Sequence, residues 1–229
     1  MSDLTIEDLD QDGAFCDAIA RVHGPTRAEF LRKAAVGGAA LLAAMAAPPP
    51  EALAKADDVS ILNFDLTFEY MQASFYTEAE RTGTIDSMRP EMARWARVFG
   101  EHERAHVKLL KGALGEAGVA KPFFNFQGVT EDGDRFAKTA VAMEDLTTAL
   151  LSGQAPRLQS RGLVAVVFSL LTVEARHAAW VRHVVGFTPV TSAFDDPRSL
   201  TEVGRVVNDT NFIASRPKTQ AKGDPRFTG

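Results

Sequence analysis

The 229-residue sequence predicts an all-α fold, a four-helix bundle with one long crossover connection and an additional C-terminal helix. Three observations support this prediction. Four long segments between residues 57 and 185 repeat apolar side chains at helical spacing. No convincing alternating strand pattern interrupts these segments, and each carries a glutamate in line with its apolar face.

The first two segments form one predicted pair of helices. Residues 58–81 carry apolar side chains almost all round, with Asp57 or Asp58 as the expected N-cap and Gly83 just beyond the end. Residues 90–115 begin at a proline, which suits the first turn of a helix. The linker between the two segments is short, so the two helices should be antiparallel.

The third and fourth segments repeat this arrangement. Residues 133–151 and 162–185 each have one apolar face, and the short connection between them again predicts an antiparallel pair. A last helix is expected to open at Asp196 and Pro197 and to end near Ile213. The bundle is therefore expected to span residues 57–214 and to be followed by a polar, flexible tail at residues 215–229.

The connection between the second and third helices decides the topology. It contains Pro122, Phe123, Phe124 and Phe126, and we expect the phenylalanines to cover one side of the bundle. Parallel second and third helices would leave a gap of about 40 Å at a rise of 1.5 Å per residue. About 14 residues of extended chain reach roughly 45 Å, so a crossover along the bundle is feasible. We favour this crossover, although an antiparallel arrangement would need far less chain.

Two copies of the motif E-x-x-H lie near the middle of predicted helices, at residues 103–106 and 174–177. Residues three apart on a helix share a face, so each motif can deliver one carboxylate and one imidazole to a single point. The first and third helices each add a lone acid in line with their core residues. The six candidate metal ligands are Glu69, Glu103, His106, Glu144, Glu174 and His177.

Four helices that offer Glu, E-x-x-H, Glu and E-x-x-H match the inward-facing ligand set of carboxylate-bridged dimetal bundles. We expect Glu103 and Glu174 to bridge two ions, Glu69 and Glu144 to be terminal ligands, and each histidine to bind one ion. Oxygen-rich ligands with one imidazole per ion suit two Fe or two Mn ions, although affinity order alone favours zinc or copper. The residues considered as supports that orient the histidines are Asp65, Gln72, Tyr76, Thr147 and Thr148.

Two other interpretations of these residues stay open. In the first, the acids and histidines form a metal-free polar network or pair with arginines, namely Arg97, Arg104 or Arg176. Converging carboxylates without a cation would repel one another, which argues against this interpretation. In the second, His102, Glu103 and His106 form the H-E-x-x-H motif of zinc peptidases. The apolar spacing turns Glu103 and His106 inward and leaves His102 about 100° away from Glu103, which argues against a peptidase.

The composition limits the partners and the ligand chemistry. A formal net charge of -5 gives no reason to expect a nucleic acid or an anionic membrane as a partner. The only cysteine, Cys16, precedes the expected bundle, so nitrogen and oxygen atoms must hold any metal there. Other ring-bearing side chains are expected to be packing residues, namely Trp95, Trp180 and His183.

Residues 1–56 contain the parts of an export signal. A basic segment at residues 26–33 precedes an apolar run that is well short of the ~20 residues a membrane span needs. The segment is similar to a twin-arginine signal, but Ala28 stands in place of the second arginine. We expect export to the periplasm or the cell exterior, without a stable membrane span. A cytoplasmic protein whose segment folds as an uncleaved helix is the alternative.

The sequence from Ile61 to His183 resembles ferritin-like domain proteins related to exported bacterial forms and to plant desiccation-related proteins. The resemblance rests on L-N-F-D-L-T-F-E-Y at residues 62–70, H-E-R-A-H-V at 102–107, M-E-D at 143–145 and V-E-A-R-H-A-A at 173–179. It implies a left-handed ferritin-like four-helix bundle and, through the six matched residues, a di-iron or di-manganese centre. A cysteine-bound iron of the rubrerythrin type is excluded by the cysteine count.

The superfamily covers iron storage, oxidation and peroxide removal, so the resemblance does not fix the reaction. The first hypothesis is an oxidoreductase that acts on O2 or H2O2 through the metal pair in stress protection. The alternatives are an iron-binding or storage protein and a structural stress protein in which the metal only stabilises the bundle. We leave open whether the chain forms a homodimer.

Overall fold

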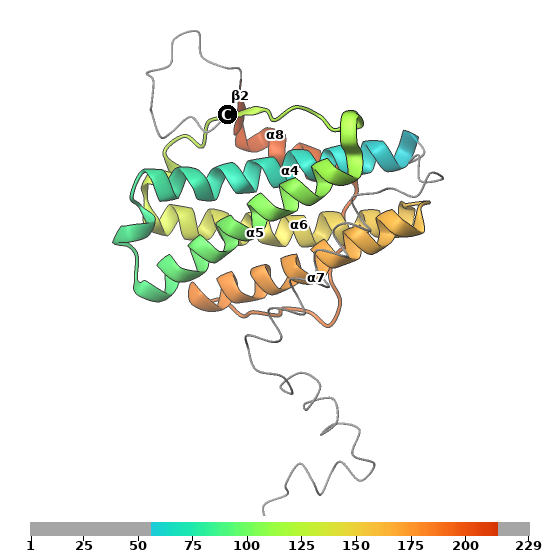
Figure 1. The fold of residues 1–229 in the computed structure, drawn as a ribbon. Helices are drawn as coiled ribbons and strands as arrows, with labels where there is room; N and C mark the ends of the chain where they lie inside the picture. Colours follow the sequence, from blue (N-terminus) through green and yellow to red (C-terminus); the bar gives the residue numbers. More distant parts are fainter. Residues whose placement is uncertain (1–55, 215–229) are drawn as a thin grey trace, which may run out of the picture. The chain divides into compact units, whose positions relative to one another are not determined.

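The computed structural model describes residues 56–214, so the expected export signal and the expected tail lie outside the described residues. Within residues 56–214 four long helices lie side by side as a bundle, and a shorter helix packs against it (Figure 1). The helices are α4 (Ala56–Arg81), α5 (Pro90–Leu114), α6 (Gly133–Gln154), α7 (Arg161–Val184) and the shorter α8 (Leu200–Thr210). The predicted four-helix bundle with an extra C-terminal helix is confirmed.

Short connections make two antiparallel helix pairs, as predicted. The turn between α4 and α5 contains the 3-10 helix η1 (Ile85–Ser87), and Gly83 ends α4 with a φ of 76°. The turn between α6 and α7 contains the 3-10 helix η4 (Ala155–Arg157). Ser160 then caps α7 by accepting a hydrogen bond from the N–H of Leu163.

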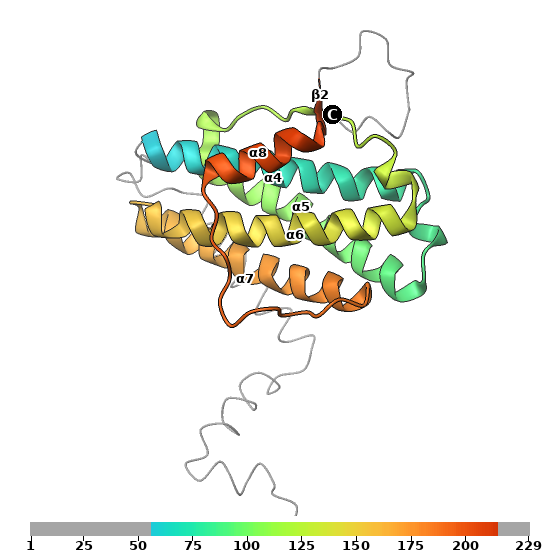
Figure 2. The ribbon, with the colours of Figure 1, turned by 180° about the vertical axis from the view of Figure 1, so that it is seen from behind.

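The connection between α5 and α6 runs the length of the bundle, so these two helices are parallel (Figures 1 and 2). It contains the 3-10 helices η2 (Gly115–Ala117) and η3 (Val129–Glu131) and the strand β1 (Phe123–Phe124). Phe124 and Phe126 are fully buried against the bundle. The predicted crossover and the covering role of its phenylalanines are confirmed.

The structure adds a small sheet that the sequence pattern does not show. Strand β1 pairs in antiparallel fashion with β2 (Ile213–Ala214), with Phe123 opposite Ala214 and Phe124 opposite Ile213. Two-residue strands are too short to show an alternating pattern. The pairing attaches the middle of the crossover to the segment that follows α8.

The last helix begins later than predicted. Asp196 and Pro197 precede α8, and Ser199 caps it in a full capping box with Glu202. Residues 186–199 lead from α7 across α6 to this helix (Figure 2). The N–H of Arg198 donates to the carbonyl of Ala149 on α6 at 2.9 Å, which attaches the segment to the bundle.

Two smaller predictions about single residues are wrong. Asp58 does not cap its own helix: its buried carboxylate accepts hydrogen bonds from the N–H groups of Gln159 and Ser160, in the turn before α7. Trp180 and His183 are not buried as expected: both are exposed on α7, Trp180 by 47%, although the Trp180 ring contacts Phe99 edge-on at 6.4 Å. Trp95 is buried at 1% exposure, as predicted.

Among the described helices, α7 has the length and apolar composition that could cross a membrane. The core helix of a soluble bundle passes the same test. Glu174 and His177 face inward from α7 and are almost fully buried, so this helix has a polar inner face within the bundle.

Candidate metal centre

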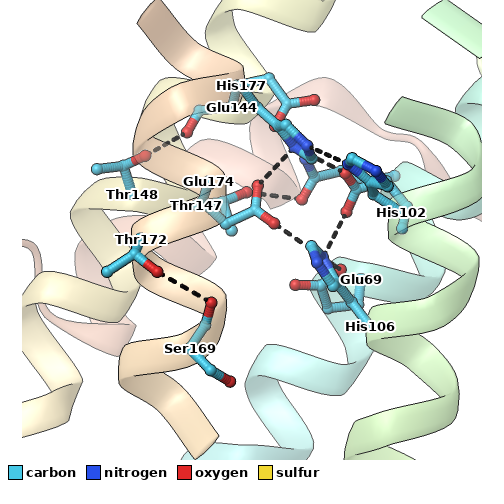
Figure 3. Close-up of polar contacts among 12 residues, drawn as sticks. Glu69, His102, His106, Glu144, Thr147, Thr148, Ser169, Thr172, Glu174 and His177 are labelled. Atoms are coloured by element: carbon cyan, nitrogen blue, oxygen red, sulfur yellow. Dashed lines mark hydrogen bonds and ion pairs between the residues drawn. The ribbon is translucent and has the colours of Figure 1, made fainter. Parts of the chain in front are cut away.

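The six predicted ligands meet in the middle of the bundle. Each of the four long helices contributes at least one of them. Figure 3 shows the side chains of Glu69, His106, Glu144, Glu174 and His177 converging from the facing helices. The four glutamates have no exposed surface, and His106 and His177 are 8% and 3% exposed. Helical spacing explains the convergence, because residues three apart in each E-x-x-H project from one inward face.

The ligand atoms form two overlapping groups, and within each group all atoms lie within 4.8 Å of one another. Glu69 and His106 belong only to the first group, and Glu144 and His177 only to the second. Glu103 and Glu174 belong to both groups. This geometry matches the assignment of Glu103 and Glu174 as shared ligands, while their role in binding metal remains a prediction.

The Nδ1 atom of each histidine faces three carboxylates. Nδ1 of His106 lies 2.8 Å from Glu174, 3.3 Å from Glu103 and 3.4 Å from Glu69. Nδ1 of His177 lies 3.1 Å from Glu103, 3.4 Å from Glu174 and 3.5 Å from Glu144. Both imidazoles therefore turn the same nitrogen towards the shared acids.

The chemistry of the cluster fits two bound cations, because hydrogen bonds within the protein leave many of the buried ligand atoms unsatisfied. Several ligand atoms are fully buried and lack an aligned hydrogen bond: both oxygens of Glu69 and Glu174, Oε1 of Glu103, Oε2 of Glu144 and Nδ1 of His177. Buried polar atoms without a partner are rare and costly. Carboxylate oxygens and imidazole nitrogens that converge on one region are the ligand set that a hard or borderline cation requires.

The arginines considered as alternative partners lie elsewhere. Arg104 pairs with Glu80 and Thr77, and Arg97 pairs with Asp86, all outside the six. Arg176 is exposed. No described arginine therefore neutralises the buried acids, and the arginine-paired network is not what the structure contains.

Protons balance the charge of the cluster in the metal-free protein. Burial alone would lower the pKa of both histidines, but the surrounding carboxylates outweigh it, so the pKa of His106 is strongly raised and that of His177 rises to about 12. Burial would raise the pKa of Glu174, but its contacts with the two histidines lower it to about 2. A bound cation would displace the histidine protons.

Three further acids and one phenol near the centre have raised pKa values that favour their neutral forms. Burial, followed by repulsion from neighbouring carboxylates, raises the pKa of Glu144 to about 8. Burial is also the main reason why the pKa of Glu69 lies well above its usual value, and why that of Tyr76 does. Asp65 is 2% exposed, and burial together with the charge of Glu174 raises its pKa to about 8.

Some of the expected supports do contact the ligands. The hydroxyl of Tyr76 donates to Glu144 at 2.5 Å, and Thr148 donates to the backbone carbonyl of Glu144 at 3.0 Å. Thr147 donates to the side-chain oxygen of Gln72 at 2.6 Å, so this pair is satisfied between two helices rather than at a ligand. The carboxylate of Asp65 has no hydrogen-bond partner. The expectation that these residues orient the histidines is wrong.

His102 is the residue that contacts a ligand histidine. Its Nδ1 lies 2.9 Å from Nε2 of His177, and the two rings stack at 5.2 Å with an angle of 12° (Figure 3). Sequence spacing along α5 could not show this contact, because its partner is 75 positions away. His102 belongs to neither ligand group, so the geometry does not support an H-E-x-x-H zinc peptidase.

These features define an all-helical bundle whose centre is a buried cluster of carboxylates and histidines. Residues 57–186, which are 130 of the 229 residues, match the family described as the ferritin-like domain. The chain therefore belongs to the ferritin-like domain family. A search among curated proteins found no match to this chain.

Proposed function

We propose that the protein is a dimetal oxidoreductase that binds two iron or two manganese ions and acts on O2 or H2O2. The observation that carries the proposal is the pair of overlapping ligand groups that share Glu103 and Glu174. Iron or manganese would supply the change of oxidation state that reduction of O2 or H2O2 requires, chemistry that amino-acid side chains lack.

The protein's own residues supply the position and the surroundings. The shared carboxylates of Glu103 and Glu174 would keep the two ions close together, and the tyrosine hydroxyl holds one oxygen of Glu144. The rings of Tyr76, Trp95 and Phe99 pack around this end of the cluster and keep water away from it. A dry shell of this kind controls access to a metal site and its reactivity.

Loading the purified protein with metal tests this proposal. Fe(II) or Mn(II) would be added to metal-free protein, and metal oxidation under air or loss of added H2O2 would be followed. Glu103→Ala removes a shared ligand and should abolish the protein-dependent rate. Glu101→Ala, an exposed acid on the same helix, serves as the matched control and should behave as wild type. Equal rates for wild type and Glu103→Ala would overturn the proposal.

A structural metal is the second candidate, and one observation favours it. Each ligand group takes side chains from both antiparallel helix pairs, so bound ions would join α4 and α5 to α6 and α7. In that case chelation should lower the melting temperature while no oxidation or peroxide loss is seen. The same purified protein separates the two candidates, because one measurement follows stability and the other follows turnover.

We also propose that the protein is exported and belongs to the desiccation-related type. The basic segment at residues 26–33, the apolar run after it and the small residues at 52–54 support export. Fractionation of cells that make the protein, with mass measurement of its mature N-terminus, tests this. A full-length chain found only in the cytoplasm would refute the proposal.

A further inference from the structure

The two halves of the cluster are held differently. In the half formed by Glu144 and His177, both side chains have partners outside the ligand set: Tyr76 donates to Glu144, and His102 bonds to His177. Phe99 also stacks on the imidazole of His177, with ring centroids 3.9 Å apart and an angle of 22°. These contacts leave this half little freedom to rearrange.

The other half has no such supports within residues 56–214. Both carboxylate oxygens of Glu69 lack a hydrogen-bond partner. The contacts of His106 all run to other ligands, from Nδ1 to three glutamates and from its ring to that of His177 at 6.1 Å. Asp65 is buried near this half, but neither of its carboxylate oxygens makes a hydrogen bond. Asp65 therefore does not hold Glu69 or His106 in place.

The contact with His102 determines which nitrogen of His177 can bind an ion. Nδ1 of His177 faces the three carboxylates, so a ligand role requires a free lone pair on this atom and the proton on Nε2. That Nε2–H group points at Nδ1 of His102, which must then accept the hydrogen bond. His102 consequently carries its own proton on Nε2, and the pair fixes both tautomers.

We propose that His102 is a positioning residue for His177, and that the half of the centre formed by Glu144 and His177 binds its ion first and more tightly. The inference rests on the proposed dimetal function. Ligands that are already held in place lose less conformational freedom on binding, which increases affinity. Removing a partner that orients a metal-binding histidine costs about 10–100-fold in metal affinity.

Three variants test the role of His102. His102→Leu removes the acceptor, whereas His102→Asn has nearly the same shape as leucine and places its side-chain oxygen close to the position of Nδ1. His183→Leu is the matched control, because His183 is an exposed histidine on α7 outside the cluster. His102 is itself an exposed residue, so its replacement should not unfold the bundle. Circular dichroism with thermal melting of the metal-free variants verifies folding.

Calorimetric titration of metal-free protein with Mn(II) is the main measurement. Wild type and His183→Leu should bind two ions in two resolved steps, and His102→Leu should weaken the tighter step about 10–100-fold. His102→Asn should restore that step. In 15N spectra of the metal-free protein, the Nε2–H of His177 should be hydrogen-bonded in wild type and in His102→Asn, and not in His102→Leu.

The outcomes separate this inference from the proposed function. Two Mn(II) steps that His102→Leu leaves unchanged would overturn the inference and leave the dimetal function standing. A loss that His102→Asn does not restore would also overturn it, since the acceptor atom would then be irrelevant. If wild type binds no ion, the proposed function fails together with the loading order. The 15N spectra then still decide whether His102 holds His177.

Discussion

Replacing Glu144 by glutamine should stabilise the metal-free protein, although Glu144 is a predicted ligand. Burial, followed by repulsion from Glu103, raises the pKa of Glu144 from 4.5 to about 8, and contact with His177 offsets only part of this rise. The side chain therefore takes up a proton when the chain folds at neutral pH. Glutamine is uncharged, keeps a similar shape and still offers an oxygen to the hydroxyl of Tyr76.

The size of the effect follows from the pKa shift. In the unfolded chain Glu144 has its ordinary pKa of 4.5, and pH 7 lies about 2.5 units above this value. Each unit corresponds to about 1.4 kcal/mol, so protonation of Glu144 on folding lowers the free energy of unfolding by about 3 kcal/mol. For an acid whose pKa is raised on folding, this cost is absent below the unfolded pKa. It grows as the pH rises from about 4.5 to about 8.

Urea unfolding in the presence of a chelator measures the difference. At pH 7, Glu144→Gln should be about 3 kcal/mol more stable than wild type, a rise in melting temperature of about 6–12 °C for a domain of this size. The advantage should shrink towards zero near pH 4.5, and added Mn(II) should stabilise the variant less than wild type. Glu101→Gln, an exposed acid, should change stability by less than about 0.5 kcal/mol. A metal-free Glu144→Gln protein that is no more stable than wild type at pH 7 would refute the reasoning.

Three further predictions concern ion binding and two structural contacts. Because the pKa of His177 is raised to about 12, metal binding must release protons, and the apparent metal affinity should rise with pH. Calorimetry in buffers of different ionisation enthalpy counts the released protons, and a count of zero would contradict this prediction. Asp58→Ala leaves two backbone N–H groups before α7 without their acceptor, and the free energy of unfolding measured in urea should fall by about 2–4 kcal/mol. An unchanged unfolding midpoint would show that water replaces the carboxylate. Gly153→Ala places a Cβ 2.1 Å from the carbonyl oxygen of Arg198, so residues 186–199 should detach from α6 and the free energy of unfolding should fall by about 1–3 kcal/mol. Limited proteolysis should then cleave this segment faster, and a wild-type cleavage rate would contradict the close contact.

The sequence predicts the bundle well because each helix carries its own local signals. The observed ends of the four long helices lie within about three residues of the predicted ends, in line with the usual uncertainty at helix termini. Asp196 and Pro197 predict an earlier start of α8, because proline suits a first helical turn. The S-x-x-E signal at Ser199 and Glu202 was also present in the sequence and marks the true start.

Contacts between helices are what the sequence does not predict. The six side chains of the cluster could be proposed because each lies on the inward face of its own helix, which spacing along a single helix reveals. The contact between His102 and His177 depends on how two helices are rotated about each other, and that rotation has no local signal. Asp58 is similar, since its partners lie about 100 positions away in the turn before α7.

Complete burial of the four glutamates has a consequence for the speed of metal exchange. With no ligand oxygen at the surface, a chelator in solution cannot contact a held ion until side chains or helices move apart. Above a modest chelator concentration, the rate of release would therefore stop increasing and would equal the rate of this opening. The lifetime of the loaded state would then be a property of the motions of the bundle rather than of the reagent used to empty it.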